Sequence, residues 1–190
     1  MRPSAHMTKT TAPAASASTV AIPAVTKLNV ATSCPKNWLN PPVTFTQTTY
    51  YSGFGSAHNI VINEDSGYAY AVGTGTCSGG LHMVNIQDPT NPTGAGCFSA
   101  DGYTHDAQCV NYIGPDADHQ GQEICFNANE DTLTIVDVSN KAAPAQVSRT
   151  GYDNSAYTHQ VWVDETQTYL LLDDELDEQN YGYNTRTRVW

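Results

Sequence analysis

The stretch Tyr157-Thr-His-Gln-Val-Trp-Val163 decides the fold, because related stretches occur twice earlier in the chain. One begins at Tyr103-Thr-His105 and the other at Ser56-Ala-His58. The three histidines are 47 (105 − 58) and 54 (159 − 105) residues apart. Periods of about 40 to 50 residues that hold several short strands are typical of β-propeller blades.

A second set of motifs repeats in the same register. Leu81-His-Met-Val-Asn-Ile86 returns as Leu133-Thr-Ile-Val-Asp-Val138, and a proline follows eleven residues after each leucine. Further apolar runs, expected to form strands, lie between these landmarks at 67–72, 122–126 and 168–172. They lack polar alternation, as strands do when blades stack face to face. No stretch keeps a helical period over three turns. We therefore predict an all-β chain, a partial β-propeller of about two and a half four-stranded antiparallel blades, truncated inside the third.

The repeats divide the chain into five segments. We predict a disordered Ala/Ser/Thr/Pro-rich tail at 1–25, a lead-in at 26–55, blade one at 56–102, blade two at 103–156 and an incomplete third blade at 157–190. A single blade cannot bury both of its faces without neighbours. We expect two large sheet faces to remain open, to be covered by the remaining blades of the parent chain or by self-association.

Charge and hydropathy exclude two classes of partner. The net charge is −11 and only eight residues are basic, which argues against nucleic acid because phosphate binding needs clustered Lys and Arg. No apolar run reaches 18 residues, so we expect no membrane span in this segment. Residues 1–25 also lack the compact apolar core of a secretory signal.

The repeated histidines are the first candidate site. His58, His105 and His159 stand at equivalent starts of the first strand of each blade, so they should form an arc around the mouth of the central channel. Convergent imidazoles suit a metal ion or a substrate. The alternative is a structural role in which each ring donates a hydrogen bond to a loop carbonyl within its own blade.

A run of acids follows the second strand of the third blade and is expected at the same rim. Carboxylates so close in sequence can bind Ca²⁺, so calcium is the preferred cofactor and a transition metal the second choice. A solvated acidic loop is the alternative. The residues of this predicted cation site are Asp106, Asp173, Asp174, Glu175 and Asp177. A weaker echo of a calcium loop, at Asp116 to Gly121, should lie at the opposite rim.

Five cysteines allow two disulfides. Cys109 and Cys125 should face one another across two strands of blade two, and Cys77 and Cys97 both belong to blade one. Buried free thiols are the alternative. Cys34 is left over.

The phrase Leu133-Thr-Ile-Val-Asp-Val138 resembles the motif of LVIVD-repeat propellers. The His-headed units look like the choice-of-anchor B family, whose fungal relatives are labelled regulatory P domain proteins. This resemblance implies a β-propeller at an extracellular or cell-surface location. It implies no catalytic residues.

No catalytic motif is visible in the sequence. Aromatic side chains near the histidine-bearing rim are candidates to line a protein, peptide or glycan site, namely Tyr103, Tyr157, Tyr181 and Tyr183. We therefore predict a secreted or surface binding scaffold, assisted by calcium. A metal-dependent propeller enzyme that uses the histidine arc is the alternative.

Overall fold

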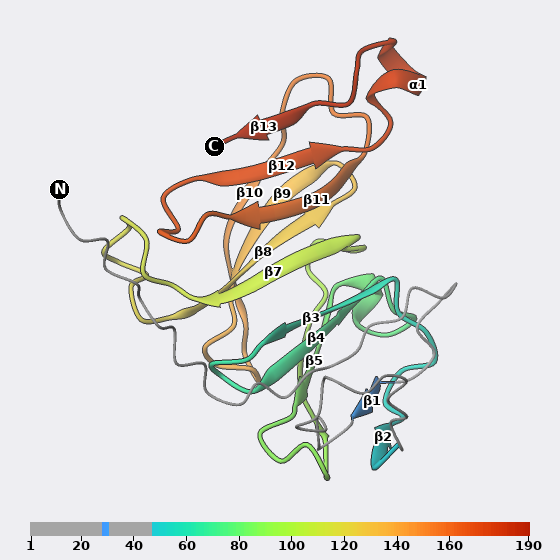
Figure 1. Cartoon of the computed structure of the whole chain (residues 1–190), viewed down its shortest axis with the longest axis vertical. Coiled ribbons are helices and arrows are strands. Elements are labelled where there is room, and N and C mark those ends of the chain that lie inside the picture. The colour runs from blue at the N-terminus through green and yellow to red at the C-terminus, as the bar shows by residue number, and fades with distance from the viewer. Residues whose placement is uncertain (1–27, 31–46) are drawn as a thin grey trace, which may run out of the picture.

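The computed structural model describes residues 28–30 and 47–190, and within them the chain is nearly all β-structure (Figure 1). A two-stranded sheet precedes the repeats and pairs β1 (Leu28–Val30) with β2 (Thr49–Tyr51). The predicted tail at 1–25, most of the lead-in and Cys34 lie outside the described residues.

Three antiparallel sheets follow in chain order, each with its strands in sequence order. The first sheet contains β3 (Asn59–Asn63), β4 (Tyr68–Val72), β5 (Leu81–Asn85) and β6 (Thr93–Phe98), with a 3-10 turn η1 (Cys77–Gly79) before β5. The second contains β7 (Asp106–Asn111), β8 (Glu123–Asn129), β9 (Thr132–Asp137) and β10 (Ala145–Thr150). The third contains β11 (Thr158–Val163), β12 (Leu170–Asp174) and β13 (Thr187–Val189), with α1 (Asp177–Tyr181) inserted before β13. These are blades one, two and three.

The first strands of the three blades lie side by side, and the remaining strands fan outward from them (Figure 1). Polar side chains connect these inner strands between blades. Asn59 donates to Asp106 at 2.5 Å, and Gln108 accepts a hydrogen bond from the backbone N–H of Val163 at 2.6 Å. This arrangement is the one expected of a partial β-propeller, and it confirms the predicted fold class.

Blade two has a neighbour on each face, which explains its apolar sequence. One hydrophobic cluster joins Tyr70 and Met83 of blade one to Cys125 and Val136 of blade two. A second joins blade two to blade three through Ile124, Phe126, Leu133, Val161 and Leu172. The central strand β8 is therefore buried at every position. A strand that is covered on both faces has no reason to alternate apolar and polar residues.

The outer faces of the first and third blades differ. Blade three exposes an apolar patch built from registered neighbours across the sheet, namely Trp162, Leu171 and Val189, of which Val189 is 66% exposed. On blade one, Ala71 and Val84 are buried under Phe54. The expectation of two open faces is therefore wrong for blade one, because the segment that precedes the first repeat folds over it.

Both predicted disulfides are present. Cys77 joins Cys97 within blade one, with a Cα–Cα distance of 5.5 Å. Cys109 joins Cys125, which is its registered partner on the neighbouring strand. Because disulfides persist in oxidising surroundings, the pair of bridges indicates an oxidising compartment.

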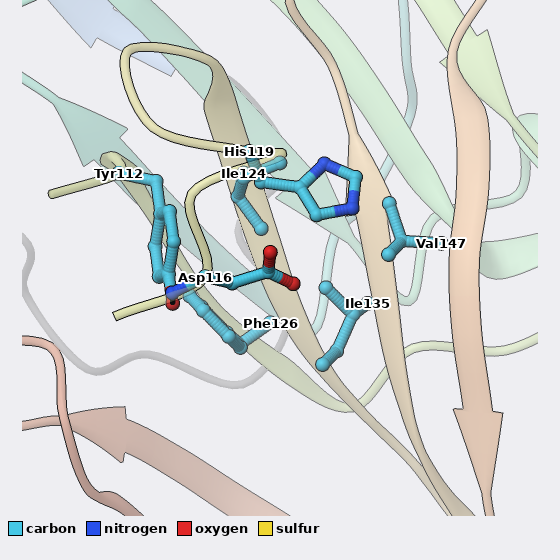
Figure 2. A pocket seen from close by; sticks show the side chains of 7 residues that line it. All are labelled: Tyr112, Asp116, His119, Ile124, Phe126, Ile135 and Val147. Carbon is cyan, nitrogen blue, oxygen red and sulfur yellow. Dashed lines mark hydrogen bonds between the residues drawn. The ribbon is translucent and has the colours of Figure 1, made fainter. Parts of the chain in front are cut away.

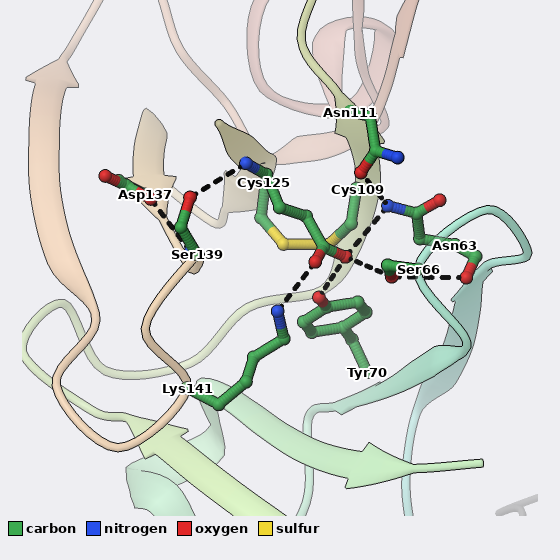
Figure 3. Close-up of a disulfide and its surroundings, with 10 residues drawn as sticks. Asn63, Ser66, Tyr70, Cys109, Asn111, Cys125, Asp137, Ser139 and Lys141 are labelled. Carbon is green, nitrogen blue, oxygen red and sulfur yellow. Dashed lines mark hydrogen bonds and ion pairs between the residues drawn. A yellow bond between two sulfur atoms is a disulfide. The ribbon is translucent and has the colours of Figure 1, made fainter. Parts of the chain in front are cut away.

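A buried carboxylate fastens blade one to blade two beside the Cys109–Cys125 bridge. Glu123, at the start of β8, accepts hydrogen bonds from Asn63 (2.8 Å), Ser66 (2.7 Å) and Tyr70 (2.5 Å). Lys141 forms an ion pair with it at 2.6 Å. The side chains of Asn63, Ser66, Tyr70 and Lys141 converge in Figure 3. The contacts reach from strands β3 and β4 of blade one to blade two, and we name this set the Glu123 cluster.

Candidate functional site

The three histidines lie at one rim because each first strand starts where its second strand ends. The backbone N–H of His58 donates to Val72, and that of His105 donates to Ala128, both at 2.8 Å. In the third blade the corresponding contact is made by Glu175, just after β12, whose backbone N–H donates to the carbonyl of Tyr157 at 3.0 Å. The backbone N–H of Thr158 donates instead to the carbonyl of Glu130 in blade two at 2.6 Å. Equivalent positions in the three repeats therefore lie close together in space.

The imidazole rings of His58, His105 and His159 lie next to one another in a row, with the neighbouring ring planes tilted by 46° and 40°. The ring centroids of His58 and His105 are 3.9 Å apart, and those of His105 and His159 are 4.4 Å apart. The structure therefore brings the predicted arc together. We name these three residues, with the Tyr103, Tyr157, Asp106, Glu130 and Glu175 side chains that interact with them or with one another, the histidine cluster.

The central ring is held by the next blade and not by its own. His105 Nδ1 lies 2.9 Å from the backbone carbonyl of His159, which can only accept, so this nitrogen carries the proton. A hydrogen bond within the blade, the structural alternative from sequence, is thus replaced at His105 by a bond between blades. The inner strands are close enough for this because they surround a common axis.

A local irregularity aims the third ring. The register between β11 and β12 shifts between Thr158 and Gln160, so His159 occupies a β-bulge. Bulges redirect a side chain relative to its sheet. His159 Nε2 consequently lies 3.7 Å from a carboxylate oxygen of Glu175, the first residue after β12.

Glycine permits the close packing around the first ring. Gly73 has a φ of +60°, and a Cβ at this position would lie 2.5 Å from the Cβ of His58 and 2.8 Å from the hydroxyl of Tyr103. Any side chain at residue 73 would therefore displace both neighbours.

Two of the four predicted tyrosines belong to the cluster. Tyr157 meets the edge of the His105 ring at a centroid distance of 5.3 Å and donates to Glu130 at 3.2 Å. Tyr103 lies 6.3 Å from the ring of His58. Burial, with Glu130 adding to it, raises the pKa of Tyr157 to about 12, so this hydroxyl stays protonated at neutral pH and can donate its hydrogen bond.

Glu130 was missed in the sequence. It lies in the turn between β8 and β9 with a φ of +44° and bridges to Thr158. The available signal was its place in the loop between the second and third strands of a blade, which shares the rim with the histidines.

Burial sets the charges at the centre of the cluster. It lowers the pKa of His105, and the neighbouring His58 lowers it further, so this ring is neutral at neutral pH. Burial also raises the pKa of Asp106, although hydrogen bonds from the backbone and from Asn59 oppose the rise. The cluster therefore presents a neutral imidazole among carboxylates.

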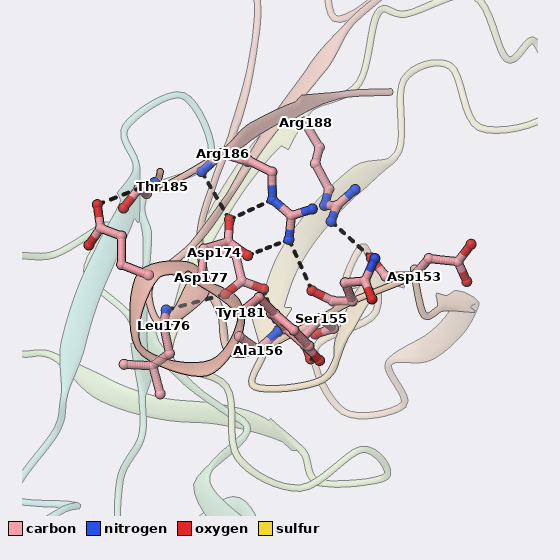
Figure 4. A network of polar contacts seen from close by, with 12 residues as sticks. Asp153, Ser155, Ala156, Asp174, Leu176, Asp177, Tyr181, Thr185, Arg186 and Arg188 are labelled. Carbon is pink, nitrogen blue, oxygen red and sulfur yellow. Dashed lines mark hydrogen bonds and ion pairs between the residues drawn. The ribbon is translucent and has the colours of Figure 1, made fainter. Parts of the chain in front are cut away.

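The predicted cation site does not form as one shell. Asp173 and Asp174 lie in β12 and not in the loop after it. The Asp174 carboxylate accepts hydrogen bonds from the backbone N–H groups of Ala156 and Tyr157 at 2.8 and 2.9 Å. Asp177 is buried and forms an ion pair with Arg186 (Figure 4). Only Glu175 of the run faces a histidine of the cluster, and calcium binding stays a prediction.

The other two predicted tyrosines make different contacts. Tyr181 and Tyr183 stack on one another with ring centroids 5.7 Å apart. Tyr181 donates to the carbonyl of Ser155 at 3.3 Å, and Arg186 covers the ring of Tyr183 at 4.6 Å. These contacts hold the segment between β12 and β13.

A small apolar pocket lies at the opposite rim of blade two, as the strand register requires. It is lined by Tyr112, Asp116, His119, Ile124, Phe126, Ile135 and Val147 (Figure 2). The Asp116 carboxylate accepts a hydrogen bond from the N–H of Asp118, and His119 Nδ1 lies 2.7 Å from Gln122. The weak calcium-loop echo therefore forms a turn beside an apolar hollow.

Among the described residues, one set of three side chains has the proximity required of metal ligands. One ligand atom each from His105, His159 and Glu175 lies within 4.8 Å of the others. Two imidazoles and a carboxylate are a recurrent donor set for Zn²⁺, in which the fourth position holds water or substrate.

The fold and the histidine cluster define a repeat protein of the β-propeller-like class. The LVIVD repeat family profile matches residues 126–150, which run from β8 through β9 to the end of β10. Comparisons with curated proteins and with solved structures give no match. The matched residues belong to blade two, so the match assigns the repeat and not an activity. Among the described residues, no helix has the length and apolar character to cross a membrane.

Proposed function

We propose that the chain belongs to an extracellular or cell-surface β-propeller that binds a protein, peptide or glycan ligand at the histidine cluster. The observation that carries this proposal is the convergence of side chains from all three blades, with the rings of His58, His105 and His159 in contact. Tyrosines and imidazoles present flat, amphipathic surfaces suited to sugars and peptides. The oxidising compartment indicated by the two disulfides supports an extracellular location, as does the resemblance to choice-of-anchor B proteins.

The test is selection of ligands by the full chain from a random peptide library and from a glycan array, each with and without Ca²⁺. We expect recovered ligands to bind Tyr157→Ala and His58→Ala at least tenfold more weakly than the unaltered chain. His119→Ala, at the opposite rim, serves as the matched control and should bind normally. Ligands that bind the cluster variants and the unaltered chain equally would contradict the proposal.

A metal-dependent enzyme is the second candidate, and the proximity of His105, His159 and Glu175 favours it. The two functions differ in what happens to a selected ligand. Mass spectrometry of recovered peptides or glycans, after incubation with chain that has been loaded with metal, should show intact ligand if the protein only binds. A cleaved or modified ligand, lost with His159→Ala, would favour the enzyme.

The apolar face of blade three supports a further partner. Trp162, Leu171 and Val189 are exposed on one side of that sheet, and exposed apolar patches of this kind mark interaction surfaces. We propose that another blade-like sheet covers them, supplied by more of the same protein or by a second copy. Sedimentation of the unaltered chain and of Trp162→Asp distinguishes these sources, because only a second copy gives dissociation to half the mass.

A further inference from the structure

We propose that His105, His159 and Glu175 bind one divalent transition-metal ion of the zinc type, with the remaining coordination position open to solvent or ligand. This inference rests on the proposed function, because it names the ion through which the histidine cluster would hold its ligand. It selects a transition metal over the calcium ion that the acidic run suggests.

The first support is distance. The ligand atoms of the three residues lie within 4.8 Å of one another, and His159 Nε2 and the Glu175 oxygen are 3.7 Å apart. Zinc–ligand bonds of about 2.0 Å in a tetrahedral shell place neighbouring ligand atoms roughly 3.3 Å apart. Small side-chain rotations that move each ligand atom by a few tenths of an ångström to about 1 Å would therefore bring the three atoms to zinc-binding distances.

The second support is the state of His105. Its Nδ1 donates to the carbonyl of His159, so Nε2 keeps its lone pair. Histidines that bind metals usually donate their other ring N–H to a carbonyl or carboxylate, which fixes the tautomer and the ring orientation. The backbone of blade three thus prepares a ligand on blade two.

The third support is a gradient of exposure. His105 is 8% exposed, whereas the side chains of His159 and Glu175 are 33% and 49% exposed. A metal held between them would be covered on one side by protein and open on the other. Open positions are typical of zinc sites that exchange water for a ligand, while purely structural sites are closed by four protein ligands.

The donor types decide between the two classes of ion. Calcium takes six to eight oxygen ligands. Here two of the three donors are imidazole nitrogens, which suit zinc, copper, iron and nickel. Two carboxylates of the acidic run already have donors, since Asp174 accepts from backbone N–H groups and Asp177 pairs with Arg186.

Two aromatic side chains act as positioning residues for His105. The ring of His58 lies 3.9 Å from its ring, and Tyr157 meets its edge at 5.3 Å. Because neither is a member of the close group, His58→Ala should weaken metal binding less than His159→Ala does.

The experiment measures Zn²⁺ binding to the full chain after removal of metal with a chelator. A Cys34→Ser background excludes binding by the leftover thiol. We expect one Zn²⁺ per chain, weakened at least tenfold by His159→Ala and by Glu175→Gln and unchanged by His119→Ala. Co²⁺ should give the intense visible absorption of a four-coordinate site, and His159→Ala should abolish it. Circular dichroism confirms that each variant is folded.

Three results would overturn the inference. They are the absence of stoichiometric Zn²⁺ in folded, chelator-treated protein, equal weakening by His119→Ala and His159→Ala, and displacement of Zn²⁺ by millimolar Ca²⁺. The selection of peptides and glycans can be repeated with chelator present. Intact ligand binding there, combined with no metal binding, would sink the metal site alone, whereas loss of cluster-dependent selection under all conditions would sink the proposed function.

Discussion

The two rims of the three-blade array carry polar clusters of opposite character. At one rim, the Glu123 carboxylate is buried and receives three hydrogen bonds and an ammonium ion. At the other, His159 and Glu175 are partly exposed and meet only at 3.7 Å. A buried polar group whose partners are complete fixes two blades together. A cluster with exposed atoms and spare hydrogen-bonding capacity remains able to receive something else.

The largest effect on stability is expected when Glu123 is removed, and this substitution tests its structural role directly. Glu123→Ala leaves Lys141, Tyr70 and Asn63 without their common acceptor between two packed blades. Loss of one partner of a buried ion pair costs about 3–5 kcal/mol. We expect a decrease of that size in the free energy of unfolding, measured by urea denaturation. The exposed Glu64→Ala is the control, and an equal effect there would refute the assignment.

The disulfide between the two clusters should contribute slightly less. Cys109 and Cys125 are 16 residues apart, and closing a loop of that length stabilises a protein by about 3 kcal/mol in the chain-entropy account. Replacing both with Ala should therefore lower the urea midpoint strongly while the visible absorption of bound Co²⁺ persists at the histidine cluster. Loss of the Co²⁺ spectrum in folded protein would show that the two regions are coupled.

The stability that Glu123 contributes should depend on pH. Burial raises the pKa of Glu123, but hydrogen bonds from Lys141, Ser66, Tyr70 and Asn63 outweigh burial, so its pKa in the folded protein is lowered. Its contribution to stability is therefore complete above the unfolded-state pKa, about 4.3, and is lost as pH falls through the folded-state pKa. The stability difference between the unaltered chain and Glu123→Gln should shrink between neutral pH and pH 3. A constant difference in urea titrations would contradict this.

The smallest effects on folding should come from the histidine cluster. His159→Ala and Glu175→Gln remove two partly exposed groups whose nearest side-chain atoms are 3.7 Å apart, and exposed pairs of this kind contribute about 0–1 kcal/mol. We expect the free energy of unfolding to change by no more than about 0.5 kcal/mol while binding is lost. A loss of 3 kcal/mol or more would make this cluster a structural element like that of Glu123.

The repeat predicted most of the fold because the burial of strands in a propeller changes the apolar pattern within each repeat. The strands expected at 67–72, 122–126 and 168–172 appear as β4, β8 and β12, within two residues at most ends. Strands that are covered on both faces lose the alternation of apolar and polar residues, and this loss is visible in the sequence of each blade. Cover of blade one by Phe54 was not readable, since a single aromatic residue before the first repeat has no periodicity.

The sequence predicted part of the candidate site, namely the histidines and Glu175, but it missed Glu130 and it included acids and tyrosines that make other contacts. Equivalent positions in repeats share a rim, so the three histidines could be placed together from spacing alone. Spacing could not show which acids of the run face the histidines and which have other partners. Asp174 accepts from backbone N–H groups that precede β11, and Asp177 pairs with Arg186, which precedes β13, so both pairings depend on how separate segments of the chain meet.

By itself, the sequence determined the all-β class, the disulfide pairs and the rim on which the histidines gather. All of these follow from spacing, because each blade is a local antiparallel unit. The tertiary structure alone decided which nitrogen of His105 is protonated, that a bulge turns His159 toward Glu175, and that Glu123 is saturated while Glu175 is not. Those features depend on distances of a few ångströms between different blades, and no pattern within one repeat encodes them.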